Sequence, residues 1–178
     1  AMLHREPELL GALLSTLTEM TVGYIDAQIE AGAQAVQLFD TWAGLLSPGE
    51  YREWIAPIHR SIFERVDRRG APLILYVNNG AHVVGQMADS GADVISLDWR
   101  ASLGEAAEAF GDRVTLQGNL DPCALSADRE KIFDWVRQMA QDAAPGRGYI
   151  ANLGHGCLPG TPVEGVRAFT DAVRSLAD

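Results

Sequence analysis

The chain has 178 residues and a formal net charge of −10 at pH 7, and its 47% hydrophobic content suits a single globular domain over residues 1–178. Its 14 Lys and Arg residues are spread thinly and form no basic stripe, which argues against binding to nucleic acid. With no visible signal peptide, no apolar run near the roughly 18 residues of a membrane span and only two cysteines, the sequence predicts a cytoplasmic protein that does not bind a membrane.

Helical patterns and short apolar runs alternate along the chain. From Leu10 to Ile29 apolar residues recur every three or four positions, which predicts a helix, and Ser47-Pro48-Gly49-Glu50 has the capping pattern of a helix start. We predict helices over residues 7–31, 47–69, 81–90, 102–110, 126–143 and 161–177. We predict strands over residues 35–39, 73–77, 94–97, 114–117 and 149–152.

Apolar strands separated by helices indicate an α/β fold with a parallel sheet covered by helices. The carboxyl ends of the strands carry polar residues, which should therefore lie on one rim: Asp40, Asn78, Asp98, Asn119 and His155. This arrangement is typical of a TIM-type (β/α) barrel enzyme, but a closed barrel has eight strands and only five are predicted here. We therefore expect a partial barrel.

Residues 148–162 stand out because an apolar strand stops in glycines that flank His155, and Thr161-Pro162 then opens a helix. Glycines on both sides of the histidine allow a sharp turn and leave room for a ligand beside the imidazole. Spacing alone also fits a simple turn that carries an exposed histidine. Both interpretations stay open at this point.

Four motifs together resemble the uroporphyrinogen decarboxylase family. In chain order they are Gln37-Leu38-Phe39-Asp40-Thr41-Trp42-Ala43-Gly44, Gly91 to Leu97-Asp98-Trp99, Leu116-Gln117-Gly118-Asn119-Leu120-Asp121-Pro122, and Asn152-Leu153-Gly154-His155-Gly156 with Pro159 and Thr161-Pro162. They occur in the family's order and at about its spacing. The resemblance covers nearly the whole chain, yet family members are roughly twice as long, so it extends only to their C-terminal half.

The resemblance implies an eight-fold α/β barrel, of which the predicted strands would be the fourth to the eighth. It also implies an activity: removal of the four acetate carboxyl groups of uroporphyrinogen III to give coproporphyrinogen III, in haem and tetrapyrrole biosynthesis. The family uses neither a metal nor an organic cofactor, so we expect none here. The expected small-molecule partner is a porphyrinogen.

The resemblance also assigns site residues. His155 matches a carboxylate-contacting histidine and is our candidate catalytic and substrate-binding residue. Thr41 would donate its hydroxyl to a substrate carboxylate, although it could instead cap backbone at the strand end. Phe39 matches an aromatic that packs against the macrocycle, although a strand residue of this kind is often part of the core.

Other polar residues near the strand ends have structural interpretations. Asp98 and Asp121 could act as general acids, but we interpret them as caps of loops and turns. We interpret Asn119 and Asn152 as amides that order loops, and Tyr76 as a core residue.

Part of the family's site is not found in this sequence. The aspartate that holds the pyrrole N–H groups, two carboxylate-binding arginines and a tyrosine come from the N-terminal half in the family, and none maps onto this chain. We therefore expect the isolated chain to be inactive. Because a five-stranded sheet would have two unpaired edges, we also expect a homodimer or a complementing N-terminal half.

Two alternatives remain. A related corrinoid-dependent methyltransferase would need a zinc site with His-x-Cys at the end of the second strand and a cysteine in the last loop, whereas the chain has Tyr76-Val77-Asn78 there and His155 and Cys157 in the loop. The other alternative is a non-catalytic half-barrel remnant that serves as an interaction module.

Overall fold

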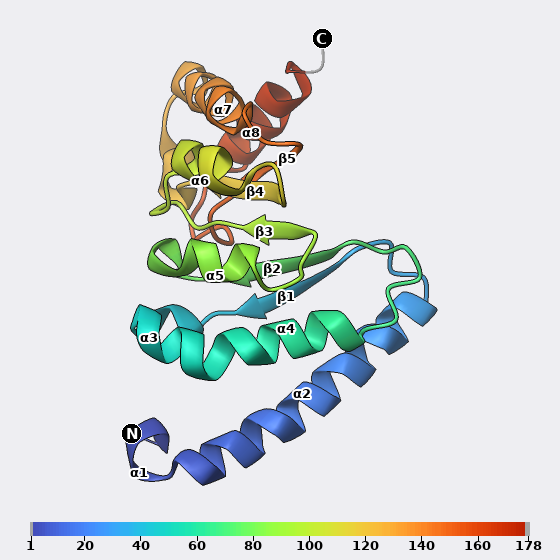
Figure 1. The fold of residues 1–178 in the computed structure, drawn as a ribbon. Coiled ribbons are helices and arrows are strands. Elements are labelled where there is room, and N and C mark those ends of the chain that lie inside the picture. The colour runs from blue at the N-terminus through green and yellow to red at the C-terminus, as the bar shows by residue number, and fades with distance from the viewer. Residues whose placement is uncertain (1, 177–178) are drawn as a thin grey trace.

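The structure is a computed structural model, and it describes residues 2–176. Within these residues one sheet contains β1 (Val36–Asp40), β2 (Leu73–Val77), β3 (Val94–Ser96), β4 (Thr115–Leu120) and β5 (Tyr149–Leu153). The strands lie in chain order, and every neighbouring pair is parallel (Figure 1). The predicted parallel sheet in sequential order is confirmed, and the strand ends predicted to share a rim lie at one edge of it.

Helices wrap around the outside of this sheet. The α-helices are α1 (Met2–Arg5), α2 (Pro7–Glu30), α3 (Pro48–Glu50), α4 (Ala56–Arg65), α5 (Val84–Ala88), α6 (Leu103–Phe110), α7 (Arg129–Ala143) and α8 (Val163–Arg174). Shorter 3-10 turns are η1 (Ala43–Leu45), η3 (Ala81–Val83) and η4 (Pro122–Ser126), and η2 (Tyr51–Ile55) is a π turn. Figure 1 shows α2 and α4 beside β1 at one end of the sheet and α7 and α8 at the other.

The predicted helix boundaries differ from the structure in places. The helix predicted from residue 126 begins at Arg129, because Pro122–Ser126 forms a 3-10 turn in which Asp121 accepts a hydrogen bond from the amide of Cys123. The last helix spans Val163–Arg174 rather than 161–177, and residue 177 lies outside the described residues. The helix predicted over 47–69 ends at Arg65 and contains the π turn.

The caps of two helices follow the sequence pattern. Ser47 and Glu50 form the predicted capping box, in which the amide of Ser47 donates to Glu50 over 2.9 Å. At the end of α2 the amides of Gly32 and Ala33 each donate over 3.0 Å to carbonyls of the last turn, and Gly32 has a φ of +104°. This is a Schellman motif, which needs a residue that tolerates left-handed backbone.

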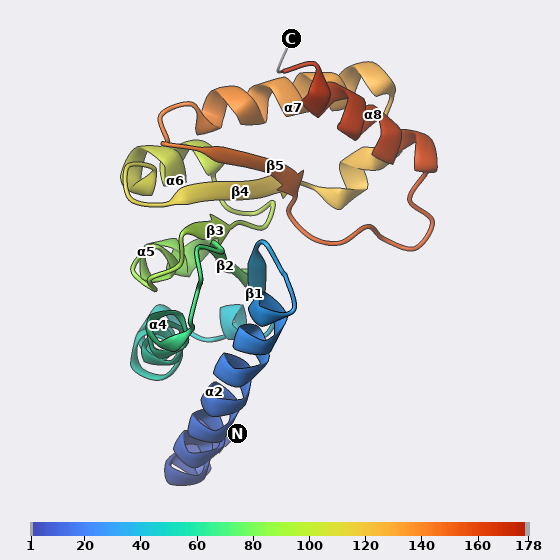
Figure 2. The ribbon, with the colours of Figure 1, turned by 90° about the vertical axis from the view of Figure 1, so that its right-hand side faces the viewer.

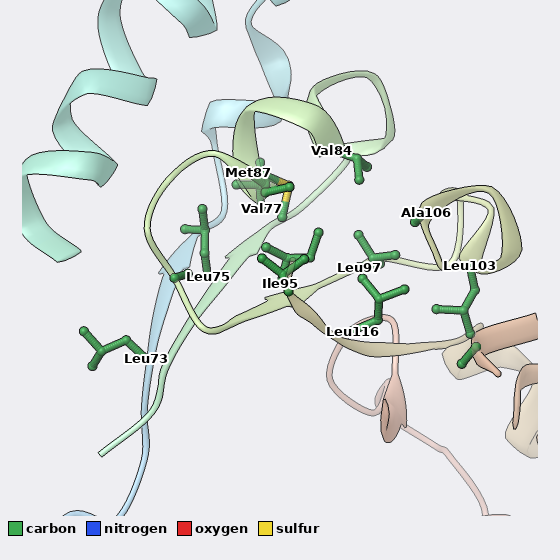
Figure 3. Close-up of a cluster of buried hydrophobic side chains, with 14 of the residues drawn as sticks. Leu73, Leu75, Val77, Val84, Met87, Ile95, Leu97, Leu103, Ala106 and Leu116 are labelled. Carbon is green, nitrogen blue, oxygen red and sulfur yellow. The ribbon is translucent and has the colours of Figure 1, made fainter. Parts of the chain in front are cut away.

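The main core lies between the sheet and its helices. Leu73, Leu75 and Val77 of β2 alternate toward the helices and are almost fully buried, as are Ile95 and Leu116 of the neighbouring strands. Figure 3 shows these side chains meeting residues of α5 and α6. All five residues of β2 are buried, which is expected for a central parallel strand covered on both faces.

The inner face of the sheet is strongly curved and carries polar residues. Gln117 of β4 donates to Gln37 of β1 over 3.0 Å and to Ser96 of β3 over 2.9 Å. In a flat sheet β1 and β4 would be about 14 Å apart, three strand spacings, which is too far for a direct contact of this kind. The hydrogen bond therefore shows that the sheet curls as an arc of a barrel, which confirms the predicted fold class.

The membrane prediction can be compared with the helices. Among residues 2–176, no helix has both the length and the apolar composition that crossing a bilayer requires.

Two glycines of α2 provide a test of the helix and its cap. A Cβ added at Gly23 or at Gly32 meets no atom within 4 Å, so only the backbone conformation differs between the two sites. We expect Gly23→Ala to raise the free energy of unfolding by roughly 0.5–1 kcal/mol. Gly32→Ala should lower it by about 1 kcal/mol, because alanine is strained at a positive φ. Urea unfolding of the two variants measures both effects, and a shift of both in one direction would contradict this account of the cap.

Candidate functional site

The three residues assigned by the resemblance lie around one concavity at the carboxyl edge of the sheet. Phe39 is the second-last residue of β1, Thr41 directly follows β1, and His155 follows β5, the strand at the opposite edge. Together they line a hollow of about 460 Å³. Its other lining residues are Gln37, Tyr76, Ser96, Asn152, Leu153 and Gly156. Figure 2 shows the long loop that leaves the carboxyl end of β5 and leads to α8; this loop contains His155.

Aromatic rings form a continuous row along this hollow. The ring centroids of Phe39 and Tyr76 are 5.6 Å apart, and those of Tyr76 and His155 are 6.4 Å apart, both with edge-to-face geometry. The ring centroids of Trp99 and His155 are also 6.4 Å apart, again with edge-to-face geometry. The exposed imidazole of His155 therefore contacts two aromatic rings.

Phe39 and Thr41 are both exposed. Phe39 is 65% exposed, so its interpretation as a core residue is wrong. Within the described residues the hydroxyl of Thr41 makes no intramolecular hydrogen bond, so it does not cap the backbone there. Both side chains are accessible to a ligand in the hollow, one as an apolar surface and the other as a hydrogen-bond donor.

Tyr76 is part of the site as well as of the core. Only 5% of it is exposed, yet it lines the hollow, and its hydroxyl donates to the carbonyl of Gly154 over 2.9 Å. Burial raises the pKa of Tyr76 to about 12, and the charge of Asp98 adds to this effect. Tyr76 thus stays a neutral donor that ties β2 to the loop of His155. Alternation along β2 puts Tyr76 on the same face as Ile74, but this pattern gave no sign of the contact with Gly154.

The two glycines beside His155 have different roles. A Cβ on Gly154 would lie 2.4 Å from the backbone nitrogen of Trp99, so Gly154 permits close packing of the loops after β3 and β5. A Cβ on Gly156 would meet nothing within 4 Å, and Gly156 lines the hollow. The predicted room beside the imidazole is therefore found at Gly156. The chain bends at Gly154 and His155, as predicted, and it does so without a positive φ at either glycine.

The structural interpretations of the other polar residues agree with the contacts. Asn119 donates to the carbonyls of Asp98 and Ala101 over 2.9 and 2.8 Å, and Asn152 accepts from the amide of Leu153. Asp98 accepts from the amide of Arg100 and forms an ion pair with its guanidinium, at 3.3 Å. These residues order the loops around the site.

A buried polar group lies behind Thr41 and was not predicted. His59 contacts Asp40 over 3.1 Å and Tyr51 over 2.9 Å, and the exposed fractions of His59 and Tyr51 are 2% and 0%. Burial alone would raise the pKa of Asp40, but hydrogen bonds from His59 and from the amides of Ala43 and Trp42 hold that pKa below its usual range. Asp40 is therefore ionised at neutral pH.

Positive charge near the hollow is limited. The guanidinium of Arg100 lies 3.9 Å above the ring of Trp99, next to His155 in the aromatic row, but it is already paired with Asp98. Across residues 2–176, no group of three or more His, Cys, Asp and Glu side chains is placed to hold a metal ion. What this wall of the hollow offers a ligand is an aromatic surface, a hydroxyl and an imidazole.

Comparison with known proteins places this geometry in a family context. The sequence profile of the family described as "Uroporphyrinogen decarboxylase (URO-D)" matches residues 1–176. Curated uroporphyrinogen decarboxylases from Gloeobacter violaceus and Alkalilimnicola ehrlichii are 45% and 43% identical to it over 97% and 99% of the chain. One from Coxiella burnetii (strain Dugway 5J108-111) is 40% identical over 99% of the chain. In each case the chain spans 50% of the relative's length.

Solved structures support the fold. A methyltransferase from Methanosarcina mazei superposes with a TM-score of 0.85 at 26% identity, over 99% of this chain and 52% of its own. A B12-independent methionine synthase from Shewanella sp. W3-18-1 gives a TM-score of 0.63 at 15% identity, over 92% and 56% of the two chains, and shows likeness of fold alone. The chain thus matches about half of larger proteins in structure as well as in sequence.

Proposed function

The chain belongs to the uroporphyrinogen decarboxylase family, and we propose that it supplies one wall of a site that converts uroporphyrinogen III to coproporphyrinogen III. The observation that carries this proposal is the meeting of Phe39, Thr41 and His155 around one hollow, although they come from opposite edges of the sheet. We keep the prediction that the protein works in the cytosol, where its two exposed cysteines would stay reduced.

Each residue of this wall has a chemical role in the proposal. The exposed ring of Phe39 packs against the face of the macrocycle, and Thr41 donates its hydroxyl to a substrate carboxylate. His155 donates a ring N–H to a second carboxylate and does so more strongly as the imidazolium. Protonation of a pyrrole carbon lets the ring accept the electron pair released when the bond to the acetate carboxyl breaks and CO₂ leaves, and groups that hold the charged side chains orient that step.

This wall is only part of the proposed site. The substrate carries eight carboxylates, whereas the chain has a net charge of −10 and pairs Arg100 with its own Asp98. The cations must therefore come from elsewhere. We propose that these cations and the pyrrole-binding acid come from the N-terminal half of a complete decarboxylase, since this chain covers only half of each relative's length.

The surface of α2 supports the need for a partner. Both ribbon views show α2 extending away from the sheet (Figures 1 and 2). Along one side of it an apolar stripe is exposed, with residues spaced by three or four positions: Leu9, Leu13, Leu17, Met20 and Tyr24. An exposed apolar stripe of this length is an interaction surface or an aggregation hazard. We propose that the N-terminal half covers it, and the alternative is a second copy of this chain.

A complementation assay tests the proposal. The N-terminal half of the Gloeobacter violaceus relative, which is 45% identical to this chain over the matched part, is coexpressed with the chain, and conversion of uroporphyrinogen to coproporphyrinogen is measured. We expect turnover from the pair and less than about one-hundredth of that rate from either part alone, because groups that act as a unit lose most of the rate when one is removed. Equal turnover by the isolated chain would contradict the partial-site proposal.

Methyl transfer is a second candidate function, because the fold of this chain is similar to that of the Methanosarcina mazei methyltransferase. The decarboxylase proposal is better supported, because identity to the curated decarboxylases is 40–45% and identity to the methyltransferase is 26%. The complemented pair can be assayed in parallel with a methylated corrinoid and a thiol. Methyl transfer without decarboxylation would replace the first proposal with the second, and neither activity in a stable pair would favour a non-catalytic interaction module.

A further inference from the structure

Three hydrogen-bonded side chains, those of Tyr51, His59 and Asp40, support the turn that carries Thr41. Tyr51 of η2 contacts Nδ1 of His59 over 2.9 Å, and Nε2 of His59 contacts Oδ2 of Asp40 over 3.1 Å. The other oxygen of Asp40 accepts from the amide of Ala43 over 3.0 Å. In the sequence, Thr41 lies between Asp40 and Ala43, the two residues that this hydrogen bond joins. The buried histidine is thus connected to the wall of the hollow through one carboxylate.

The sequence builds this arrangement with an irregular helix. Tyr51 and His59 are eight residues apart, and in a regular α-helix they would be rotated by about 80° from alignment. Pro57 has no backbone N–H to donate, and directly before it the chain forms a π turn in which the amide of Ala56 bonds to the carbonyl of Tyr51. The wider turn holds more residues and brings Tyr51 and His59 onto one face. Pro57 therefore accounts for a pairing that regular helical spacing does not predict.

The donors and acceptors of these three side chains match in one order when the imidazole is neutral. The ionised carboxylate of Asp40 can only accept, so Nε2 of His59 carries the proton of that contact. Nδ1 then has no proton and accepts from the hydroxyl of Tyr51. Both contacts of the imidazole are satisfied, and Asp40 and Tyr51 together select one tautomer of His59.

A gain in folding stability does not by itself explain why Tyr51, His59 and Asp40 are hydrogen-bonded to one another. A hydrogen-bonded polar set in a core is often no more stable than apolar residues of the same volume, because its desolvation cost offsets the gain. What the apolar replacement cannot do is hold Asp40 in one position. A role in positioning therefore accounts better for a buried Tyr-His pair that contacts a single residue of the site.

We propose that His59 is a positioning residue, which holds Asp40 so that the turn of residues 40–43 presents Thr41 to a carboxylate of the substrate. The identity of the ligand rests on the proposed function, whereas the control of the turn does not. His59 touches no substrate in this proposal. Its effect passes through Asp40 and the amide of Ala43.

The test compares variants of the chain by NMR and by ligand binding. His59→Leu removes both contacts, and His59→Gln keeps a donor near the place of Nε2. Asp40→Asn removes the charge of the carboxylate. Because the side chain of Asp40 is partly exposed, we expect this variant to fold. The exposed residue His4 gives the controls His4→Leu and His4→Gln. The measurements are the exchange rate of the Ala43 amide, the tautomer of His59 and the affinity for coproporphyrinogen under anaerobic conditions.

We expect exchange of the Ala43 amide to be at least tenfold faster in His59→Leu and Asp40→Asn than in the parent, and affinity for coproporphyrinogen to fall about tenfold. His59→Gln should stay within about threefold of the parent in both, and the controls should not change. In the parent, Nδ1 of His59 should be unprotonated. If His59→Leu fails to fold, Asp40→Asn and His59→Gln still decide the outcome.

Unchanged Ala43 exchange in folded His59→Leu or in Asp40→Asn would overturn the proposal, and so would equal losses in His59→Leu and His59→Gln. A parent chain that does not bind coproporphyrinogen, in isolation or with its N-terminal half, counts against the proposed function instead. In that case the Ala43 exchange rates still decide whether His59 positions the turn.

Discussion

Replacing His155 with alanine in the complemented enzyme should lower kcat/KM for uroporphyrinogen about a hundredfold, the loss typical of removing one well-placed donor from an active site. The imidazole is exposed, lines the hollow and contacts the rings of Tyr76 and Trp99 edge to face, so it is available to a ligand there. Alanine would leave the carboxylate that it contacts without a donor. The rate is measured as coproporphyrinogen formed by the complemented pair.

The same substitution at a distant histidine tests whether the loss of rate is specific to His155. His4 is exposed and lies in α1, at the opposite end of the molecule from β5 (Figure 1). His4→Ala should keep the parent rate within about twofold. Equal rates for His155→Ala and the parent would remove His155 from the proposed site.

Gly154→Ala should lower the free energy of unfolding by about 3 kcal/mol, at the upper end of the usual cost of overpacking. The added Cβ would lie 2.4 Å from the nitrogen of Trp99 and 3.0 Å from the carbonyl carbon of Asp98, and both are backbone atoms that cannot rotate away. The loops after β3 and β5 would have to separate. That movement would also displace His155 from Trp99 and Tyr76, so activity of the complemented enzyme should fall with stability.

Gly156→Ala provides the control, because it lies on the other side of the same histidine. A Cβ there meets nothing within 4 Å, so the free energy of unfolding should change by less than about 0.5 kcal/mol. Urea unfolding measures both variants. Similar losses of unfolding free energy in Gly154→Ala and Gly156→Ala would contradict the explanation that Gly154 is needed for the close approach of the two loops.

The strands were predictable because each is a short apolar run with a polar or glycine residue at its end. The predicted start of each strand agrees with the structure to within one residue. The main difference is at β4, which was predicted to stop at Gln117 and continues to Leu120. Gly118 and Asn119 do not look like strand residues in sequence, but they pair with Ala151 and Asn152 of β5, and this tertiary contact outweighs their local preference.

The site was predictable only in part. The motifs identified Phe39, Thr41 and His155, and the structure brings them together, whereas residue spacing alone left a structural alternative for each. Two contributions could not be read from the pattern. Tyr76 appeared as one apolar residue in a buried strand, because the contact of its hydroxyl with Gly154 joins residues 78 positions apart.

The other missed contribution is the set of Tyr51, His59 and Asp40. Eight residues of regular α-helix would leave Tyr51 and His59 about 80° apart around the axis, so helical periodicity did not suggest that their side chains pair. Only the π turn before Pro57 aligns the two side chains. Irregular geometry of this kind depends on backbone hydrogen bonds that a hydrophobic pattern does not encode.

The most direct test of the proposed wall is to follow the histidine ring signals of the chain by NMR while coproporphyrinogen is added under anaerobic conditions. The chain has four histidines, and His4 and His82 act as internal controls for His155. We predict that the ring signals of His155 shift progressively and saturate, together with the methyl signal of Thr41, while those of His4 and His82 stay in place. Binding that leaves His155 and Thr41 unchanged would contradict the account.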